Sequence, residues 1–310
     1  MTRDLDDLIL DALKQKKLSA AQILVARAGR MRLFKCYGKA SEKSFFDLAS
    51  LTKPLAATLL TMRSVQEGRL SLNDPVEKFF ATKNLAGVTL TELLRHTSSL
   101  VAWRAFYPQR GIDLKTDFTA NRQKILRSIL HDKKCVVPAN RGTVIYSDLG
   151  YILLAAILEK VCQKNFGCIF NQGIAKPLGL AKQIFFLPHG QKSPFVRSRF
   201  VPTQECSVRK RLVQGEVMDL NCHFLGGVSG HAGLFANARA IHRILQELRQ
   251  AHFGKSRLIA KNTFDVFCQP PASRHLSKRY FTLGFDTPTQ PGSLTGKMFS
   301  KNTIGHWGYS

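Results

Sequence analysis

A serine and a lysine stand three residues apart in the segment Ser50-Leu51-Thr52-Lys53, a spacing that suits nucleophilic catalysis. On a helix, residues spaced by three lie on one face with Cβ atoms about 5–6 Å apart, so the lysine amine can reach the serine hydroxyl. A serine hydroxyl is a weak nucleophile until a neighbouring group takes up its proton. The pair therefore predicts a serine nucleophile, although Ser50 taken alone also fits a helix-capping serine.

A second copy of the spacing, from Ser207 to Lys210, shows that this pattern is weak by itself. That copy lies in an arginine-rich stretch with no apolar helix behind it. Ser50 instead opens a long helical pattern over residues 50–67, which ends at Gly68. The N-terminus of a helix also places a positive dipole beside developing negative charge. We therefore expect Ser50, and not Ser207, to be the nucleophile.

Two more short motifs follow Ser50 at wide intervals. Tyr146-Ser147-Asp148 is the only Y-x-[N/D] sequence in the chain and stands just before a strongly apolar helical pattern. His306-Trp307-Gly308 fits a [K/H]-x-G pattern and lies in a predicted terminal strand. The order S-x-x-K, then Y-x-N, then K-x-G resembles that of the penicillin-recognising serine hydrolases, of which a sister arrangement carries S-D-N in the middle.

The resemblance covers nearly the whole chain. Residues 45–80, 88–100 and 142–161 resemble the segments around the first two motifs in proteins related to class C β-lactamases. Residues 214–235 resemble a stretch found in an esterase and peptidoglycan-hydrolase branch of that superfamily. The chain is identified as a member of the penicillin-binding-protein and class C β-lactamase superfamily on these segments together.

The resemblance implies a role for each matching residue. Ser50 would form an acyl-enzyme, and Lys53 and Tyr146 would share the base and acid roles. The backbone N–H groups of Ser50 and Tyr309 would form the oxyanion hole, in which fixed donors stabilise the tetrahedral intermediate. Asp148, His306 and Gly308 would bind substrate, with His231 as an additional residue of the pocket. No cofactor and no metal are implied.

Three positions depart from the more frequent pattern. Asp148 replaces an asparagine and cannot donate an amide hydrogen bond to a substrate carbonyl. His306 replaces a lysine, and a neutral imidazole binds a carboxylate less well than an ammonium does. Met218 stands where histidine is usual in an H-D-x-N element that also contains Asp219 and Asn221. We therefore expect weak or absent turnover of β-lactams.

The glycine-rich stretch at residues 226–233 has two interpretations. It fits a loop that contacts substrate, and it also fits a tight turn that demands small residues. His96, in the loop that follows a short helical pattern, is expected to have a structural role. The sequence does not decide between the two roles of the glycine-rich stretch.

The hydrophobic periodicity predicts an α+β fold. A hairpin is expected over residues 23–28 and 31–37 after an amphipathic N-terminal helix, with further helices over residues 89–95, 151–163, 238–249 and 262–268. Strand patterns return at residues 279–284 and 303–309. We predict one catalytic domain over residues 1–310, with an antiparallel sheet formed from both chain ends (1–60 and about 230–310) and a mainly helical region over about 61–229.

Composition limits the remaining possibilities. The 310 residues carry a net charge of +25, but the basic residues come in small scattered groups without a nucleic-acid motif, so we expect no nucleic-acid partner. Seven cysteines without a C-x-x-C spacing indicate reduced thiols. The start of the chain lacks the features of a signal peptide, and the longest apolar run is too short for a membrane span. A cytoplasmic monomer with a small or peptide-like substrate is expected.

The end of the chain raises a separate expectation. In the resembled superfamily the third motif is followed by two strands and a helix, whereas this sequence stops at Ser310. The resemblance therefore implies a truncated chain. Three classes of function remain open: a serine hydrolase for esters or amides, with a peptidoglycan-fragment amidase or D,D-peptidase as its variant; a truncated inactive homologue; and a basic polyanion-binding protein.

Overall fold

The computed structural model describes residues 2–107, 117–191, 193–270, 280–289 and 298–310, and it begins with a helix and a hairpin. Helix α1 (Thr2–Lys14) is followed by strands β1 (Ala20–Arg27) and β2 (Arg30–Gly38), which pair antiparallel. Both Lys35 and Tyr37 of β2 bond to the Asp6 carboxylate of α1, which fixes the helix against the hairpin. The predicted hairpin and N-terminal helix are confirmed.

The segment that contains the S-x-x-K motif is helical but not uniformly so. After β3 (Phe46–Asp47) it forms a 3₁₀ turn, η1 (Ala49–Leu51), then a π-helical stretch, η2 (Lys53–Thr58), and finally α2 (Leu59–Gln66). Pro54 has no N–H to donate back along the helix, which accounts for the irregular start. The helix closes as a Schellman motif, in which Arg69 N–H bonds to the Ser64 carbonyl and Gly68 N–H to the Val65 carbonyl.

The middle of the chain is mainly helical, as expected. Helix α5 (Asp148–Cys162) is apolar almost all round and lies at the centre of the main hydrophobic core, because a helix without a polar face has to be covered on every side. Its neighbours include α2, η2, α3 (Leu90–Leu94), β4 (Ser98–Leu100), α4 (Phe118–His131) and α6 (Phe166–Phe170). The same region contains η4 (Lys133–Cys135), β5 (Val136–Arg141) and η5 (Asn171–Ala175).

Strands from distant parts of the sequence meet beside the S-x-x-K segment. In a three-stranded antiparallel sheet, β9 (Leu234–Ala236) lies between β3 and β6 (Ile184–Phe186), and Phe46 pairs with Ala236. The remaining described elements are β7 (Glu205–Cys206), β8 (Arg211–Leu212), α7 (Leu220–Phe224), α8 (Ala238–His252), α9 (Lys261–Cys268), β10 (Tyr280–Phe281) and β11 (Asp286–Thr287), besides the short 3₁₀ turns η3 (Val76–Lys78) and η6 (Arg197–Arg199). The α+β class is confirmed, with antiparallel pairing in every described sheet.

The end of the chain differs from the expected strands. Residues 303–309 run as an extended segment whose described ladder contact is one isolated bridge, between Gly305 and Asp286. A regular strand needs a partner along its length, and a single bridge does not provide one. The other predicted strand is reduced to β10, because the chain turns at Leu283 and Gly284; residue 279 lies outside the described part.

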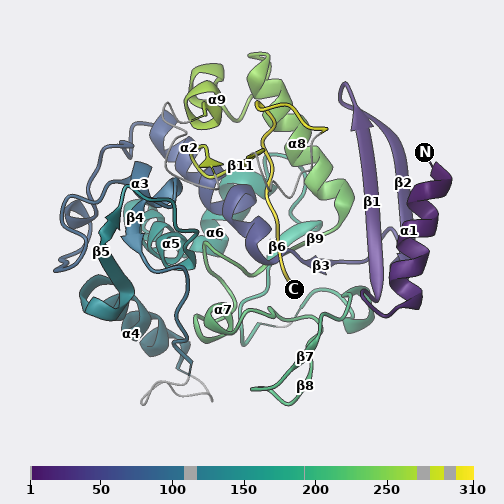
Figure 1. Cartoon of the computed structure of the whole chain (residues 1–310), viewed down its shortest axis with the longest axis horizontal. Helices are drawn as coiled ribbons and strands as arrows, with labels where there is room; N and C mark the ends of the chain where they lie inside the picture. Colours follow the sequence, from purple (N-terminus) through teal and green to yellow (C-terminus); the bar gives the residue numbers. More distant parts are fainter. Residues whose placement is uncertain (1, 108–116, 192, 271–279, 290–297) are drawn as a thin grey trace.

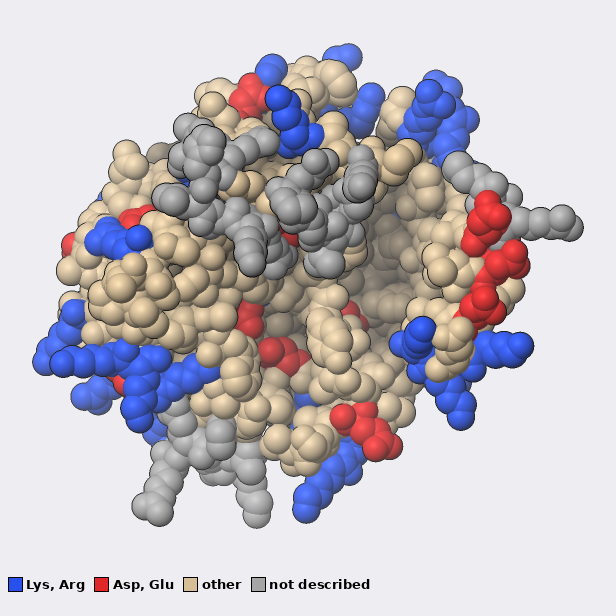
Figure 2. All heavy atoms as spheres, in the orientation of Figure 1, with Lys and Arg blue, Asp and Glu red and all other residues tan. Residues whose placement is uncertain are grey.

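The hairpin stands apart from the helical body on one side of the molecule, with α8 between them (Figure 1). Figure 2 shows that this face is hollowed beside the hairpin, and a cavity of about 460 Å³ lies between β1 and α8.

Lys and Arg side chains gather in several separate groups around the face, as the sequence indicated. Among the described helices, none combines the length and the apolar character that crossing a bilayer requires.

Candidate active site

The turn before Ser50 is tight and is held by a buried carboxylate. Ala49 has a φ of +44°, a left-handed conformation that costs free energy for any residue with a Cβ. Asp47 Oδ1 accepts a hydrogen bond from the Ala49 N–H at 2.9 Å, which stabilises the turn. The chain thus changes from strand β3 to the helical segment within two residues, and Ser50 is left only partly covered at the start of that segment.

Lys53 is completely buried and its amine lies between three oxygen atoms. The amine is 3.0 Å from Ser50 Oγ, 2.6 Å from Asp148 Oδ1 and 3.3 Å from the backbone carbonyl oxygen of His231. The Tyr146 side chain hydrogen-bonds to the same amine, and the centre of its ring lies 4.8 Å from Nζ. The structure therefore brings Ser50, Lys53 and Tyr146 together although almost a hundred residues separate the first from the last.

Asp148 decides the charge of Lys53. Burial by itself would lower the pKa of the Lys53 amine, but the charges and hydrogen bonds of Asp148 and Tyr146 outweigh burial and raise the pKa above its ordinary value. Lys53 is consequently an ammonium at neutral pH. The carboxylate expected to bind substrate is therefore engaged by Lys53 through one of its oxygens, in a pair whose lysine is fully buried.

Tyr146 is positioned by the residue that follows it and by the ring of His96. The next residue, Ser147, caps helix α5 with its side chain, which accepts a hydrogen bond from the Gly150 N–H. The Ser147 N–H donates to Nδ1 of the buried His96, and the His96 ring lies 4.6 Å from the Tyr146 ring. His96 thus has the structural role that its loop position indicated, and that role is to support Tyr146.

The glycine-rich stretch is a packed loop beneath Lys53. At Gly230 an added Cβ would lie 2.2 Å from the backbone oxygen of Tyr151, so a side chain has no room there. Residues 228–236 are buried throughout, which agrees with the tight-turn interpretation of this stretch. Its contact with the site is the His231 carbonyl, which accepts from Lys53.

The His231 side chain is buried and bonds to protein partners. Its side chain is 1% exposed, and both ring nitrogens face protein partners: Nε2 lies 2.9 Å from Asp219 Oδ1, and Nδ1 lies 2.8 Å from Ser229 Oγ. These contacts give the His231 side chain a packing role in this structure, and its substrate-binding role stays a prediction. Burial would raise the pKa of Asp219, but His231, the Cys222 N–H and Lys53 together lower the pKa below its ordinary value.

The third motif lies beside the turn that contains Ser50. Gly308 passes so close to the nucleophile turn that an added Cβ would be 2.7 Å from the Leu48 carbonyl oxygen. The Ser310 hydroxyl donates to the Asp47 carbonyl at 3.1 Å, which places the end of the segment beside the same turn. The His306 ring lies 5.8 Å from that of Tyr146, whereas the Tyr309 side chain is 83% exposed. The segment therefore carries the Tyr309 backbone past the Ser50 turn, while the Tyr309 side chain is largely exposed.

One group of side chains near Lys53 has the composition of a metal site. Within the described ranges, Asp148, Asp219 and His231 place oxygen and nitrogen atoms within 4.8 Å of one another. The Lys53 ammonium already occupies the space beside Asp148, and the His231 imidazole bonds directly to Asp219. Side-chain cations and donors thus satisfy these carboxylates, and the arrangement does not require a bound metal.

Sequence reasoning did not single out Asp47. Its Oδ1 holds the Ala49 N–H and its Oδ2 accepts from the Met218 N–H at 2.7 Å. Burial raises the pKa of Asp47 to about 6, against the effect of these two hydrogen bonds. A carboxylate inside the apolar run that precedes Ser50 was the available signal, since a charged residue there needs a specific reason.

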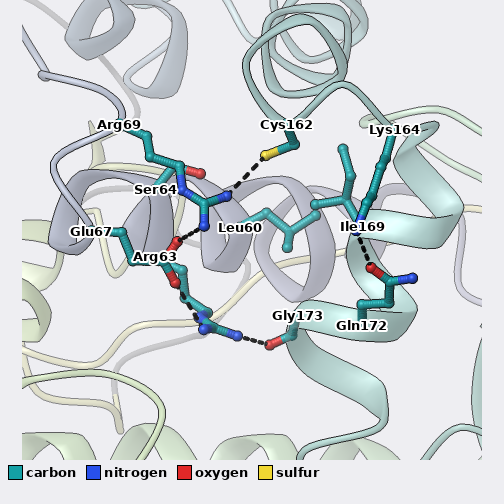
Figure 3. Close-up of a pocket in the computed structure, with 10 residues that line it drawn as sticks. All are labelled: Leu60, Arg63, Ser64, Glu67, Arg69, Cys162, Lys164, Ile169, Gln172 and Gly173. Carbon is teal, nitrogen blue, oxygen red and sulfur yellow. Dashed lines mark hydrogen bonds and ion pairs between the residues drawn. The ribbon is translucent and has the colours of Figure 1, made fainter.

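A separate polar cavity of about 200 Å³ lies at the far end of α2 (Figure 3). Glu67 lies between two arginines there, at 2.8 Å from Arg63 and 3.0 Å from Arg69, while Lys164 bonds to Gln172. Cations at the C-terminal ends of α2 and α5 offset the negative end of each helix dipole. None of the predicted site residues lines this cavity.

Comparison with known proteins places these observations in a family. A family model described as Beta-lactamase matches residues 5–310. An N-acetylmuramyl-L-alanine amidase from Bacillus subtilis (strain 168) is 27% identical over 298 residues, which are 88% of this chain and 65% of the amidase. The chain therefore spans about two thirds of the length of this relative.

Two solved structures show the same fold at low sequence identity. EstCE1, a hydrolase with promiscuous acyltransferase activity, is 20% identical with a TM-score of 0.73, over 98% of this chain and 86% of that protein. The octameric penicillin-binding protein homologue from Pyrococcus abyssi is also 20% identical, with a TM-score of 0.70, over 92% of this chain and 65% of that protein.

Proposed function

The chain belongs to the Beta-lactamase family, and from this premise we propose that it is a serine hydrolase, which forms an acyl-enzyme on Ser50 and cleaves an ester or amide bond. The observation that carries the proposal is the position of the Lys53 amine, 3.0 Å from Ser50 Oγ and 2.6 Å from Asp148 Oδ1. A buried ammonium is costly to maintain, and here it donates to the Ser50 oxygen, which leaves the Ser50 hydroxyl proton free to be directed to another acceptor.

The charge of Lys53 assigns the proton steps. When Ser50 Oγ bonds to the carbonyl carbon of the substrate, its proton has to pass to a group with a free lone pair, which an ammonium lacks. We assign this step to the Tyr146 hydroxyl, which contacts the Lys53 amine. Its oxygen accepts the Ser50 proton as its own proton passes to the leaving oxygen or nitrogen, and water later releases the acyl group from Ser50 by the reverse sequence.

The oxyanion hole is assigned to the backbone N–H groups of Ser50 and Tyr309. Two observations support this assignment: Gly308 approaches the Leu48 carbonyl closely, and the Ser310 hydroxyl bonds to the Asp47 carbonyl. The terminal segment therefore runs beside Ser50, where one of its N–H groups can reach the developing oxyanion. Donors fixed in this way commonly contribute on the order of 100- to 1,000-fold to the rate.

The groups near Ser50 support a proposal for the substrate class. Asp148 is bonded to Lys53, and the third motif offers an imidazole at His306 where a lysine would give a permanent positive charge. We propose a small or peptide-like ester or amide and slow turnover of β-lactams. A narrower candidate, an amidase for peptidoglycan fragments, is favoured by the name of the Bacillus subtilis relative.

The test is covalent labelling with a fluorescent alkylphosphonate, followed by mass spectrometry of the labelled peptide. We expect the label on Ser50, none in Ser50→Ala, and an unchanged amount in Ser207→Ala. Ser207 is a suitable control because it has the same spacing to a lysine but lies exposed in the turn between β7 and β8. A label that survives in Ser50→Ala would remove the proposal.

The narrower candidate needs a separate assay. Purified muropeptides and p-nitrophenyl acetate are offered to the same preparation, and the products are followed by mass spectrometry and absorbance. Release of the peptide from the N-acetylmuramyl group would select the amidase, whereas ester cleavage without muropeptide cleavage would select an esterase. Rapid turnover of nitrocefin would contradict the substrate class proposed here.

A further inference from the structure

The buried side chains around Ser50 form a closed circuit of contacts. Ser50 contacts Lys53, Lys53 donates to the carbonyl of His231, and the His231 ring bonds to Asp219. The residue before Asp219 is Met218, whose N–H donates to Asp47. Asp47 in turn accepts from the Ala49 N–H, next to Ser50. The circuit therefore returns to the nucleophile from the other side.

We propose that Asp47, Asp219 and His231 are positioning residues. Together they hold the strained turn at Ala49 and the amine of Lys53 in the positions that bring both next to Ser50. The inference deepens the proposed function and rests on it for its catalytic consequence. These residues come from three elements: the end of β3, the N-cap of α7 and the loop before β9.

Two features show that the circuit does more than fill space. Ala49 keeps a left-handed φ that an alanine does not prefer, and the Asp47 carboxylate supplies a hydrogen bond to that residue. A carboxylate that is only 6% exposed is costly to bury, so its two backbone donors are needed to keep it there. The free-energy cost of burying the Asp47 carboxylate is therefore incurred at the turn that orients Ser50.

Asp219 has a comparable position on the other branch. Its Oδ1 is shared between the Cys222 N–H at 2.6 Å and the His231 ring at 2.9 Å. The imidazole is fixed at its second nitrogen by Ser229. The His231 ring is consequently fixed at both of its nitrogens, which also restrains the His231 backbone. The carbonyl of that backbone accepts the hydrogen bond from Lys53. Loss of the Asp219 carboxylate should therefore displace Lys53 without removing any group that touches a substrate.

The experiment compares Asp47→Ala, Asp47→Asn and Asp219→Asn with the wild type. We expect the rate constant for phosphonate labelling of Ser50 to fall by about 10- to 100-fold, because a displacement near 1 Å can cost on the order of 100-fold. With p-nitrophenyl acetate, kcat should fall while KM changes little. Asn at position 47 keeps one acceptor for the Ala49 N–H, so its loss should be smaller than that of Ala.

Asp74→Asn is the matched control. Asp74 is another buried carboxylate, 8% exposed, that accepts a backbone N–H, from Ser71 at 2.8 Å, and it lies outside the circuit. This variant should lose stability but keep its labelling rate within about twofold. Equal labelling rates for the wild type and all three circuit variants would overturn the proposal.

A second readout does not depend on catalysis. Hydrogen exchange measured by mass spectrometry on the peptide that covers residues 46–53 should become faster in Asp47→Asn and Asp219→Asn, and should not change in Asp74→Asn. If the wild-type protein fails to label at Ser50, the proposed function fails, while faster exchange in the two circuit variants alone would still establish the positioning circuit. Unchanged exchange in both would reject it.

Discussion

The two ends of the segment 49–69 carry ion pairs of the same chemical type in opposite environments. At the first end Lys53 is fully buried and pairs with Asp148, whose side chain is 16% exposed. At the second end Arg63 and Arg69 share Glu67, and the three side chains are 26%, 52% and 28% exposed (Figure 3). The carboxylate of the first pair raises the pKa of its lysine, and that lysine contacts Ser50, whereas the second cluster is partly exposed beside a helix terminus.

This contrast shows that burial, more than the presence of an ion pair, decides what the pair does. Exposed pairs contribute about 0–1 kcal/mol, because solvent screens them and their side chains lose entropy. A buried charge whose partner is removed costs several kcal/mol instead. Substitution of the pair at Lys53 should therefore have a large effect on stability and activity. Substitution of the cluster at Glu67, which stabilises the end of a helix, should have a small one.

The largest effect is expected from Lys53→Met, which removes the ammonium of the buried ion pair. Methionine has nearly the length of lysine and fills the buried space, but it leaves Asp148 and Ser50 without the ammonium. We expect kcat/KM for p-nitrophenyl acetate to fall at least about 1,000-fold. Circular dichroism provides the control for folding, and a folded variant with more than a tenth of the wild-type activity would refute the role of Lys53.

A smaller loss of activity is expected from Gly308→Ala, in the terminal segment that runs beside the Ser50 turn. The new Cβ would lie 2.7 Å from the Leu48 carbonyl oxygen, so the terminal segment has to move away from the nucleophile turn. We expect a loss of about 100-fold in kcat. Tyr309→Ala is the matched control, because its side chain is 83% exposed and only its backbone is assigned a role. Similar losses in both variants would contradict the backbone assignment.

The buried carboxylate of Asp47 should make stability depend on pH. Its pKa is raised to about 6 in the folded protein, so the folded state binds a proton that the unfolded state releases between about pH 4 and 6. The contribution of this group is fully present below pH 4 and is lost as the pH rises through 6. The unfolding free energy of the wild type, relative to Asp47→Asn, should fall by on the order of 3 kcal/mol from pH 4 to 7.

Urea unfolding of the two proteins at several pH values measures this difference directly. Because all other groups are common to both proteins, their contributions cancel in the comparison. A difference that stays constant from pH 4 to 7, or that rises with pH, would show that the Asp47 carboxyl is not raised in pKa by its burial.

Asp148→Asn tests whether Lys53 acts as an ammonium. Without the carboxylate, burial dominates and the pKa of Lys53 falls, so the amine loses its proton at a lower pH. If the ammonium is the active form, the basic limb of the kcat profile moves to lower pH by at least about one unit, which is a tenfold loss on that limb. A shift of the acidic limb with higher activity at neutral pH would instead make neutral Lys53 the base.

The smallest effect is expected at the exposed end of the segment. Glu67→Gln removes the shared partner of Arg63 and Arg69, which are both partly in solvent. The unfolding free energy should fall by less than about 1 kcal/mol, and less at high salt, with an unchanged labelling rate at Ser50. A loss as large as that of a buried pair would show that this cluster is held more firmly than its exposure indicates.

Local sequence signals were sufficient for the hairpin and for several helices, whereas helix α4 and the strands around β9 had no predicted range. The hairpin, the amphipathic helices and the apolar helix α5 follow from periodicity and turn residues, and the structure has them within a few residues of the expected bounds. The terminal strand is the exception. Its alternating pattern describes an extended chain, but a strand also requires a partner, and periodicity contains no information about which backbone lies beside it.

The sequence by itself determined the family and the α+β class, and it indicated the residues that we propose carry the chemistry, because S-x-x-K and Y-x-D are short-range patterns of residue type and spacing. Only the tertiary structure decided the charge of Lys53, since that charge depends on full burial and on a carboxylate 95 positions away. It also placed the His231 carbonyl against Lys53 and the His231 ring against Asp219, and it brought the Asp47 carboxylate to the Ala49 N–H. Burial and hydrogen-bond partners are properties of the folded chain, and they set these roles.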